Sequence, residues 1–237
     1  MKWEFTPDEF MHIWEETGLD RYPYPLQLIS SVQWQNEYAK IVQELRARLP
    51  RGGDVDLSAA LRVAADPEVS AVLIGKRRHR IRAYGAIDAN IGVTLFQRPG
   101  PTDEFGGNVV VEISSSALVS KVFAAVVGSV SAGRGPALVE SIDRIEVSLE
   151  SWTGSKVTTA ERMRSLLSTR RVGEGHIEVR AALRDRRSLP AQYMSWVDVD
   201  GDGCYAFREQ YNDFHVEPLS GAVVAREVAR MMHEWRE

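Results

Sequence analysis

The sequence predicts an α+β fold in which one structural unit occurs twice. When the segment DFHVEPLSGAVVAREVARMM, which starts at Asp213, is shifted back by 105 positions, it aligns with NVVVEISSSALVSKVFAAVV, which starts at Asn108. Six aligned positions are identical, whereas average residue usage gives about one or two over such a window. Each copy has the pattern of a strand, a turn and an amphipathic helix. The fold is therefore expected to have quasi-twofold symmetry.

Three strand-like segments precede each copy. They are short, rich in β-branched and aromatic residues, and bounded by turn formers. They are VSAVLIG (69–75), RIRAYGAID (80–88) and GVTLFQR (92–98) in the first unit, and HIEVRAAL (176–183), AQYMSWVDV (191–199) and CYAFREQ (204–210) in the second. Connections of hairpin length make neighbouring strands antiparallel. We therefore expect one continuous antiparallel sheet or two sheets related by a pseudo-twofold axis.

Three helices are predicted ahead of the first unit. The capping box Thr6-Pro7-Asp8-Glu9 places a proline at the first helical position, and the helix is expected to end at Gly18. Apolar residues spaced by three and four positions over 34–49 predict a second helix, with Trp34 in the core. Asp56 is expected to cap a third, short helix that reaches Ala65.

The remaining elements join and close the two units. Residues 116–130 are predicted to be a helix, and residues 138–153 an extended connector. Thr158 and Glu161 form a second capping-box pattern that starts another helix. Apolar residues at helical spacing over 220–235 predict the last helix.

The length and composition favour one compact body. We expect a single domain over residues 1–237, with pseudo-repeats at about 66–130 and 174–237 behind an N-terminal strand and helices in residues 1–65. A net charge of −4 argues against a dedicated nucleic-acid-binding protein. No apolar run approaches the roughly 18 residues that a membrane span needs, and the first residues do not resemble a signal peptide. We therefore expect a cytoplasmic protein without membrane insertion.

The sharpest local motif is DVDGDGCYAFRE, which fits a calcium-binding loop. Asp198, Asp200, Asp202 and Glu209 occupy liganding positions of the twelve-residue pattern, with Gly203 between them. Loops of that class join two helices, whereas both flanks here alternate as strands do. A hairpin turn is therefore the favoured interpretation. A calcium-binding interaction module remains the alternative.

The sequence offers no local signature of catalysis. A nucleophile needs a base within hydrogen-bond reach, and only a pairing of Cys204 with His215 across a hairpin is conceivable. The basic run at 76–80 is expected to be a solvated hairpin tip, and the segment GSVSAGRG (128–135) lacks the lysine and hydroxyl residue of a phosphate loop. We expect no enzyme activity, no cofactor and no metal.

The whole chain resembles the EspG family of type VII (ESX) secretion chaperones. Four stretches carry the resemblance: WEFTPDEFMHIWEETGLDRYPYPLQL, LSAALRVAADPEVSAVLIG, GEGHIEV, and SWVDVDGDGCYAF followed by HVEPLSGAVVAREVARMMHEW. His176, Glu178 and Cys204 depart from the residues common in the family at these places. The resemblance implies a quasi-twofold fold with a central antiparallel sheet flanked by helical bundles. It also implies a cytosolic chaperone that binds a PE/PPE-type heterodimer and keeps it soluble for export.

The partner contacts are expected at the sheet turns, on adjacent strand residues and on the last helix. The candidate partner-binding residues are Asp88, Asn90, Trp196, Asp200, Asp202 and Met231. The turn at Asp88 is short where members of the family often carry a longer recognition loop. We expect the protein to be a monomer or a weak homodimer apart from its partner.

Overall fold

A single antiparallel sheet of ten strands forms the centre of the molecule. The computed structural model describes residues 1–128, 131–147, 157–185 and 189–233. The strands are β1 (Lys2–Phe5), β2 (Val69–Lys76), β3 (Arg80–Asp88), β4 (Ile91–Gln97), β5 (Val109–Ser115), β6 (Leu138–Ser141), β7 (Arg171–Arg180), β8 (Gln192–Val199), β9 (Gly203–Gln210) and β10 (Asp213–Pro218). Their order across the sheet is β1-β5-β4-β3-β2-β7-β8-β9-β10-β6. Of the two arrangements open from the sequence, the continuous sheet is therefore the correct one.

The strand order carries the predicted quasi-twofold symmetry. Strands β2 and β7 pair antiparallel at the centre, with Leu73 opposite Ile177. On one side of this pair follow β3, β4, β5 and β1, and on the other follow β8, β9, β10 and β6. The duplication thus extends beyond the aligned segments, because each half also has an outer strand from the chain ahead of its meander.

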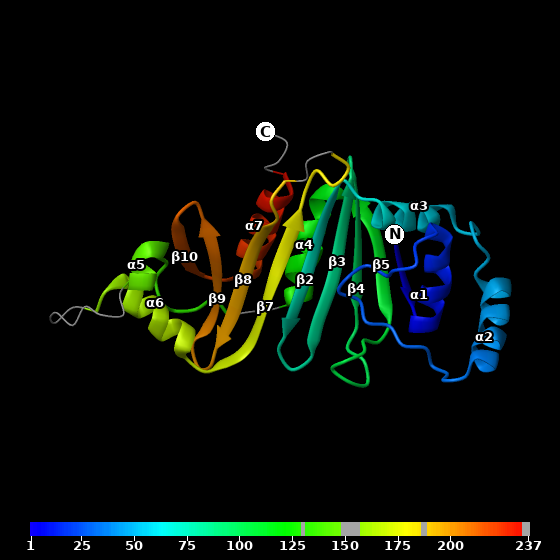
Figure 1. Ribbon diagram of the computed structural model, residues 1–237, viewed down its shortest axis with the longest axis horizontal. Helices are drawn as coiled ribbons and strands as arrows, with labels where there is room; N and C mark the ends of the chain where they lie inside the picture. Colours follow the sequence, from blue (N-terminus) through cyan, green and yellow to red (C-terminus); the bar gives the residue numbers. More distant parts are fainter. Residues whose placement is uncertain (129–130, 148–156, 186–188, 234–237) are drawn as a thin grey trace.

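The helices cover the two faces of the sheet differently (Figure 1). They are α1 (Pro7–Trp14), α2 (Gln35–Arg48), α3 (Val55–Ala65), α4 (Ser116–Val127), α5 (Ile142–Val147), α6 (Thr159–Ser168) and α7 (Gly221–His233), with a 3-10 turn at Glu15–Thr17. Helices α4 and α7, the last element of each unit, pack side by side across the centre of one face. Helices α1 to α3 lie at one end of the molecule, and α5 and α6 lie at the other.

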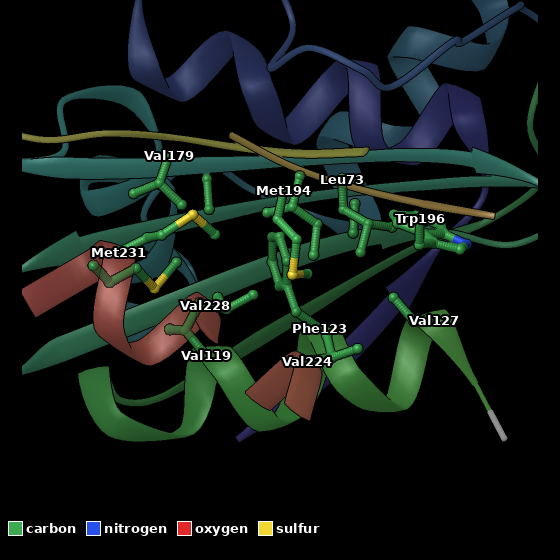
Figure 2. Close-up of a cluster of buried hydrophobic side chains, with 14 of the residues drawn as sticks. Leu73, Val119, Phe123, Val127, Val179, Met194, Trp196, Val224, Val228 and Met231 are labelled. Carbon is green, nitrogen blue, oxygen red and sulfur yellow. The ribbon is translucent and has the colours of Figure 1, made fainter. Parts of the chain in front are cut away.

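The core is divided because successive strand residues point to opposite faces. On β9, Cys204 and Ala206 join the cluster under α4 and α7, whereas Tyr205 and Phe207 join the cluster that includes Met163 of α6. A third cluster joins α1 and α3 to β3, β4 and β5. Figure 2 shows the first and largest of these clusters, in which α4 and α7 meet the central strands. Two helical groups therefore share the face opposite α4 and α7.

The first helix begins as its sequence predicts. The Thr6 hydroxyl accepts a hydrogen bond from the Glu9 backbone N–H at 3.3 Å, and the Glu9 carboxylate accepts one from the Thr6 N–H at 2.8 Å. This capping box satisfies two donors that the first turn otherwise leaves unpaired. Gly18 ends the following 3-10 turn with a φ of 74°, a left-handed conformation that glycine adopts without steric cost.

Loss of this cap is expected to be measurable. Thr6→Ala should lower the free energy of unfolding by about 1 kcal/mol, because alanine has no side-chain oxygen for the Glu9 N–H. Thr6→Ser keeps that oxygen and serves as the control, with stability near that of the wild type. Urea unfolding followed by circular dichroism measures both. Equal losses in the two variants would show that the contribution of Thr6 is not capping.

Several local predictions are wrong. Asp54, not Asp56, caps α3, where its carboxylate accepts from the N–H groups of Asp56 and Leu57. Residues 142–147 form α5 instead of continuing as an extended connector, and residues 148–153 lie outside the described residues. Trp34 is not in the core, since it precedes α2 with 68% of its surface exposed.

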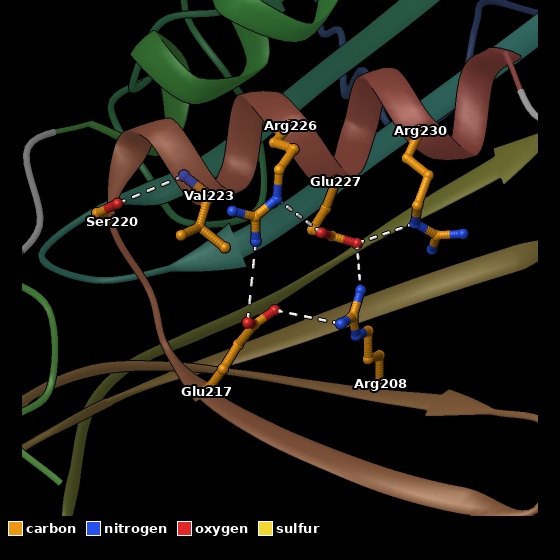
Figure 3. Close-up of polar contacts among 7 residues, drawn as sticks. All are labelled: Arg208, Glu217, Ser220, Val223, Arg226, Glu227 and Arg230. Carbon is orange, nitrogen blue, oxygen red and sulfur yellow. Dashed lines mark hydrogen bonds and ion pairs between the residues drawn. The ribbon is translucent and has the colours of Figure 1, made fainter. Parts of the chain in front are cut away.

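A buried charge network fixes α7 to the second half of the sheet (Figure 3). The Glu227 carboxylate of α7 is buried and pairs with Arg208 of β9, with Arg226 Nε at 3.1 Å and with Arg230 Nε at 3.0 Å. Glu217 pairs with Arg208 at 3.7 Å and with Arg226 at 3.9 Å. Burial by itself raises the pKa of Glu227, but the hydrogen bonds and positive charges of the three arginines outweigh it and hold the pKa below its ordinary value.

Candidate functional site

The face of the sheet opposite α4 and α7 carries an open groove near α6. One part has a volume of about 660 Å³ and is lined by Tyr193, Ser195 and Val197 of β8, by Leu167 of α6 and by Phe207 of β9. An adjoining part of about 480 Å³ shares Arg171, Ser195 and Val197 and extends to Ile74 and His176 at the centre of the sheet. We call these two parts together the sheet groove.

The sheet groove exists because the helices of the two halves leave the central strands uncovered on this face. Tyr193, a large apolar side chain, is 55% exposed. Phe207 packs against Phe214 in a tilted arrangement with ring centroids 6.1 Å apart, next to the apolar side of α6. Exposed aromatic surface beside a helical wall is typical of surfaces that bind another protein.

The strands β8 and β9 separate within the sheet groove. They are paired from Val199 opposite Gly203 to Ser195 opposite Phe207, and no pairing continues beyond that point. Each strand still pairs with its other neighbour, β7 or β10. Arg208 and Arg230, which belong to the α7 face, therefore also line the groove. The separation leaves backbone N–H and C=O groups along both strands available to a ligand.

The turn residues singled out from the sequence lie at opposite ends of the sheet. Asp88 pairs with Arg184, just after β7, at 3.0 Å, whereas Asp200 pairs with Arg170, just before β7, at 3.5 Å. The ten residues of β7 separate these ends by about 33 Å at the usual rise of a strand. Asn90 is exposed in the same turn as Asp88. Of these residues, Asp200 lies toward the sheet groove, because its partner Arg170 directly precedes the lining residue Arg171.

Two other candidates are core residues. Trp196 and Met231 are each 1% exposed and belong to the cluster between the sheet and the helices α4 and α7 (Figure 2). Strand alternation explains why Trp196 is buried under α4 and α7, because its neighbours Ser195 and Val197 point to the opposite face of the sheet. Both side chains are buried in this structure and form no part of its surface, which disfavours their prediction as partner contacts.

The aspartates of the calcium motif do not converge. Asp198 pairs with Arg77 at 2.5 Å, and Asp202 accepts from the Tyr205 hydroxyl at 2.6 Å and pairs with Arg134 at 3.3 Å. Glu209 lies far along β9, opposite Phe214, because the expected loop is the β8–β9 hairpin followed by a strand. Among the described residues, no group of three potential ligands could hold a metal ion. The geometry of the described residues thus does not support the calcium alternative.

Cys204 does not have the environment of a nucleophile. The thiol is buried, and burial followed by the nearby carboxylate of Asp198 raises its pKa well above the ordinary value. His215 stands opposite Arg208 in the β9–β10 pair, four positions along β9 from Cys204. The conceivable Cys204–His215 pair is therefore not formed.

Sequence reasoning missed Tyr193, His176 and Leu167 as residues of the site. The alternation of β8 places Tyr193 and Ser195 on the face opposite Trp196, and this signal was present in the sequence. The separation of β8 from β9 opens the groove, and no pattern in the sequence predicts it. No helix among the described residues is both long and apolar enough to cross a membrane.

Comparison with known proteins points to one family. Residues 6–230 match the EspG family, whereas no curated protein sequence matches the chain. A similar solved structure is that of the Mycobacterium tuberculosis type VII secretion system chaperone EspG5 in complex with the PE25–PPE41 dimer. The two chains superpose with a TM-score of 0.65 at 13% identity, over 98% of this chain and 97% of the other. At this identity the superposition concerns the fold, while the family match covers nearly the whole sequence; the chain belongs to the EspG family.

Proposed function

We propose that this protein is a cytosolic chaperone of type VII secretion, which binds a PE/PPE-type heterodimer and keeps it soluble for export. The match of residues 6–230 to the EspG family carries this proposal. The superposition with EspG5, which was solved with the PE25–PPE41 dimer, supports it because the likeness extends over 98% of the chain. The protein acts by binding alone and takes no part in a chemical reaction.

The sheet groove is the surface that we assign to the heterodimer. An apolar tip of a helical partner aggregates when it is exposed, and covering that tip requires an apolar surface with a polar rim. The groove offers the exposed ring of Tyr193 and the half-buried Leu167 for apolar contact, above the buried Phe207. Arg171 lines the groove, and Asp200 pairs with Arg170, the residue before it. This chemistry suits a hydrophobic protein segment better than a small polar substrate.

Co-expression with PE/PPE-type pairs from the same genome tests the proposal. The wild-type chaperone is expected to co-purify with one such pair through a tag on the PE protein. Tyr193→Asp should reduce recovery of the chaperone by at least about tenfold, because a carboxylate at the centre of the apolar contact must be desolvated without a partner. Lys40→Glu, on the exposed surface of α2, is the control and should co-purify normally.

The same experiment tests the assignment of the binding surface and the chaperone function separately. If Tyr193→Asp co-purified as the wild type does, the heterodimer would use another surface. If no pair retained the wild-type protein, the chaperone function itself would be contradicted.

A further inference from the structure

A second groove lies on the opposite face of the sheet, beside α4. It has a volume of about 650 Å³ and is lined by residues of α4, β1, β3, β4 and β5 and by the β2–β3 hairpin. Its apolar surface comes from Ile81, Phe96, Leu118, Val122 and Val126. Leu118 is 40% exposed, although the helical pattern alone places it inward. We call this surface the α4 groove; it opens on the face opposite the sheet groove, and Arg80 lines both.

The α4 groove is strongly basic. Seven arginine and lysine side chains line it, against the single carboxylate of Glu112. Some of these side chains already form ion pairs: Arg98 pairs with Glu4 at 2.8 Å, and Lys2 pairs with Glu112 at 3.9 Å. The side chains of Arg78 and Lys121 make no hydrogen bond or ion pair with any other residue that the structure describes. The groove therefore joins apolar surface to positive charge that is not neutralised.

The internal duplication shows what occupies the same place in the other half. The 105-residue shift relates Glu112, Lys121, Val122 and Ala125 to the network residues Glu217, Arg226, Glu227 and Arg230, in that order. Phe96 corresponds to Arg208, because Phe96 stands opposite Val110 in β5 as Arg208 stands opposite His215 in β10. All five counterparts in the first half line the α4 groove.

The two halves thus differ in how this space is filled. In the second half the Glu227 carboxylate enters from α7 and is held by three arginines (Figure 3). In the first half Val122 takes the place of Glu227, and Phe96 and Ala125 take the places of two of those arginines. The first half consequently has apolar surface where the second half has a carboxylate, while Lys121 carries a positive charge as Arg226 does.

We infer that the α4 groove binds an acidic, amphipathic segment of a partner protein. A carboxylate of that segment pairs with Lys121, the counterpart of Arg226, and further carboxylates face Arg78 at the rim. An apolar side chain of the segment contacts Phe96, Leu118 and Val122. Complementary charge raises the association rate and the specificity, and the apolar contact supplies most of the affinity. This inference does not depend on the proposed PE/PPE function.

Fluorescence anisotropy with three synthetic peptides tests the inference on the full chain. The probe is a fluorescein-labelled amphipathic helix of leucine and glutamate, and its two controls carry glutamine or lysine in place of glutamate. The acidic peptide is expected to bind, and the glutamine and lysine peptides should bind at least about tenfold more weakly. An acidic peptide that does not bind, or a glutamine peptide that binds equally well, overturns the inference.

Variants of the protein locate the binding. Leu118→Asp and Lys121→Glu change exposed positions and should each weaken acidic-peptide binding at least about tenfold. Lys40→Glu makes the same charge change on α2 and should leave it unaltered. Equal weakening by Lys121→Glu and Lys40→Glu would mean that only net charge matters and would contradict a specific site.

A further variant fills the α4 groove from within. Val122→Glu places a carboxylate in the groove beside Lys121 and should abolish peptide binding while the protein retains its cooperative thermal transition. Competition between dodecanoate and the acidic peptide tests whether the groove binds a lipid carboxylate instead of a protein segment. If dodecanoate bound in a Lys121-dependent way and the acidic peptide did not bind, the groove would be a site for a lipid carboxylate, and the inference of a protein segment would be wrong.

Discussion

Replacing Trp196 with alanine is expected to lower the free energy of unfolding by about 3–5 kcal/mol, the usual cost of removing a buried aromatic side chain. The indole is 1% exposed under α4 and α7 and lies against the two glycines at the centre of the sheet. A methyl group added at Gly75 would come within 2.7 Å of the ring, and one at Gly175 would overlap it. The two central strands are therefore shaped around this ring, and alanine leaves a cavity that they cannot close.

Urea unfolding measures this loss, and Tyr193→Ala on the same strand is the matched control. Tyr193 is mostly exposed on the other face, so its replacement should cost less than about 1 kcal/mol. The alternative assignment of Trp196 as a partner contact predicts the reverse pattern. A stable Trp196→Ala protein that no longer bound its partner would support that alternative.

Replacing Glu227 with leucine is expected to destabilise the protein by about 3 kcal/mol, because it leaves the buried side of the arginine network without its anion. Arg208 is largely buried and would lose its principal partner, while Glu217 stands 3.7 Å away and compensates only in part. Glu15→Leu is the control, since Glu15 pairs with Arg51 at the surface. Loss of that exposed pair should cost less than about 1 kcal/mol.

The same carboxylate makes stability depend on pH. The pKa of Glu227 is lower in the folded protein than its ordinary value of 4.5. Its contribution is therefore fully present above that value and is lost as the pH falls through the lower folded pKa. Unfolding free energies measured from about pH 7 to about pH 3 should fall more steeply for the wild type than for Glu227→Gln. Parallel curves would show that Glu227 does not contribute in its charged form.

Most of the secondary structure could be predicted because its signals are local. The capping boxes at Thr6 and Thr158 start α1 and α6, and the alternating strand patterns locate the meanders. The conformation of the segments that were predicted wrongly is determined by contacts with the rest of the protein. Residues 142–147 are rich in β-branched residues, as strands are, but form a short helix against β6. Trp34 has helical spacing, but its side chain is mostly exposed.

The duplication could be recognised in the sequence, but the difference in packing between the two halves could not. The sequence alignment shows that Val122 corresponds to Glu227, but it does not show what surrounds either residue. The strand pairing is needed to relate Phe96 to Arg208 and to place the two groups of corresponding residues beside α4 and α7. Likewise, the calcium pattern is satisfied residue by residue. Its failure becomes visible only when Asp198 and Asp202 are found paired with Arg77 and Arg134, which come from distant parts of the chain.

The mass of the complex in solution tests the central claim most directly. The protein, purified with a PE/PPE-type pair from its own genome, is measured by size-exclusion chromatography with light scattering. We predict a single peak whose mass equals one copy of each of the three chains. A protein that elutes at its own mass of 26.5 kDa with every such pair would contradict the chaperone function and leave only the shared fold.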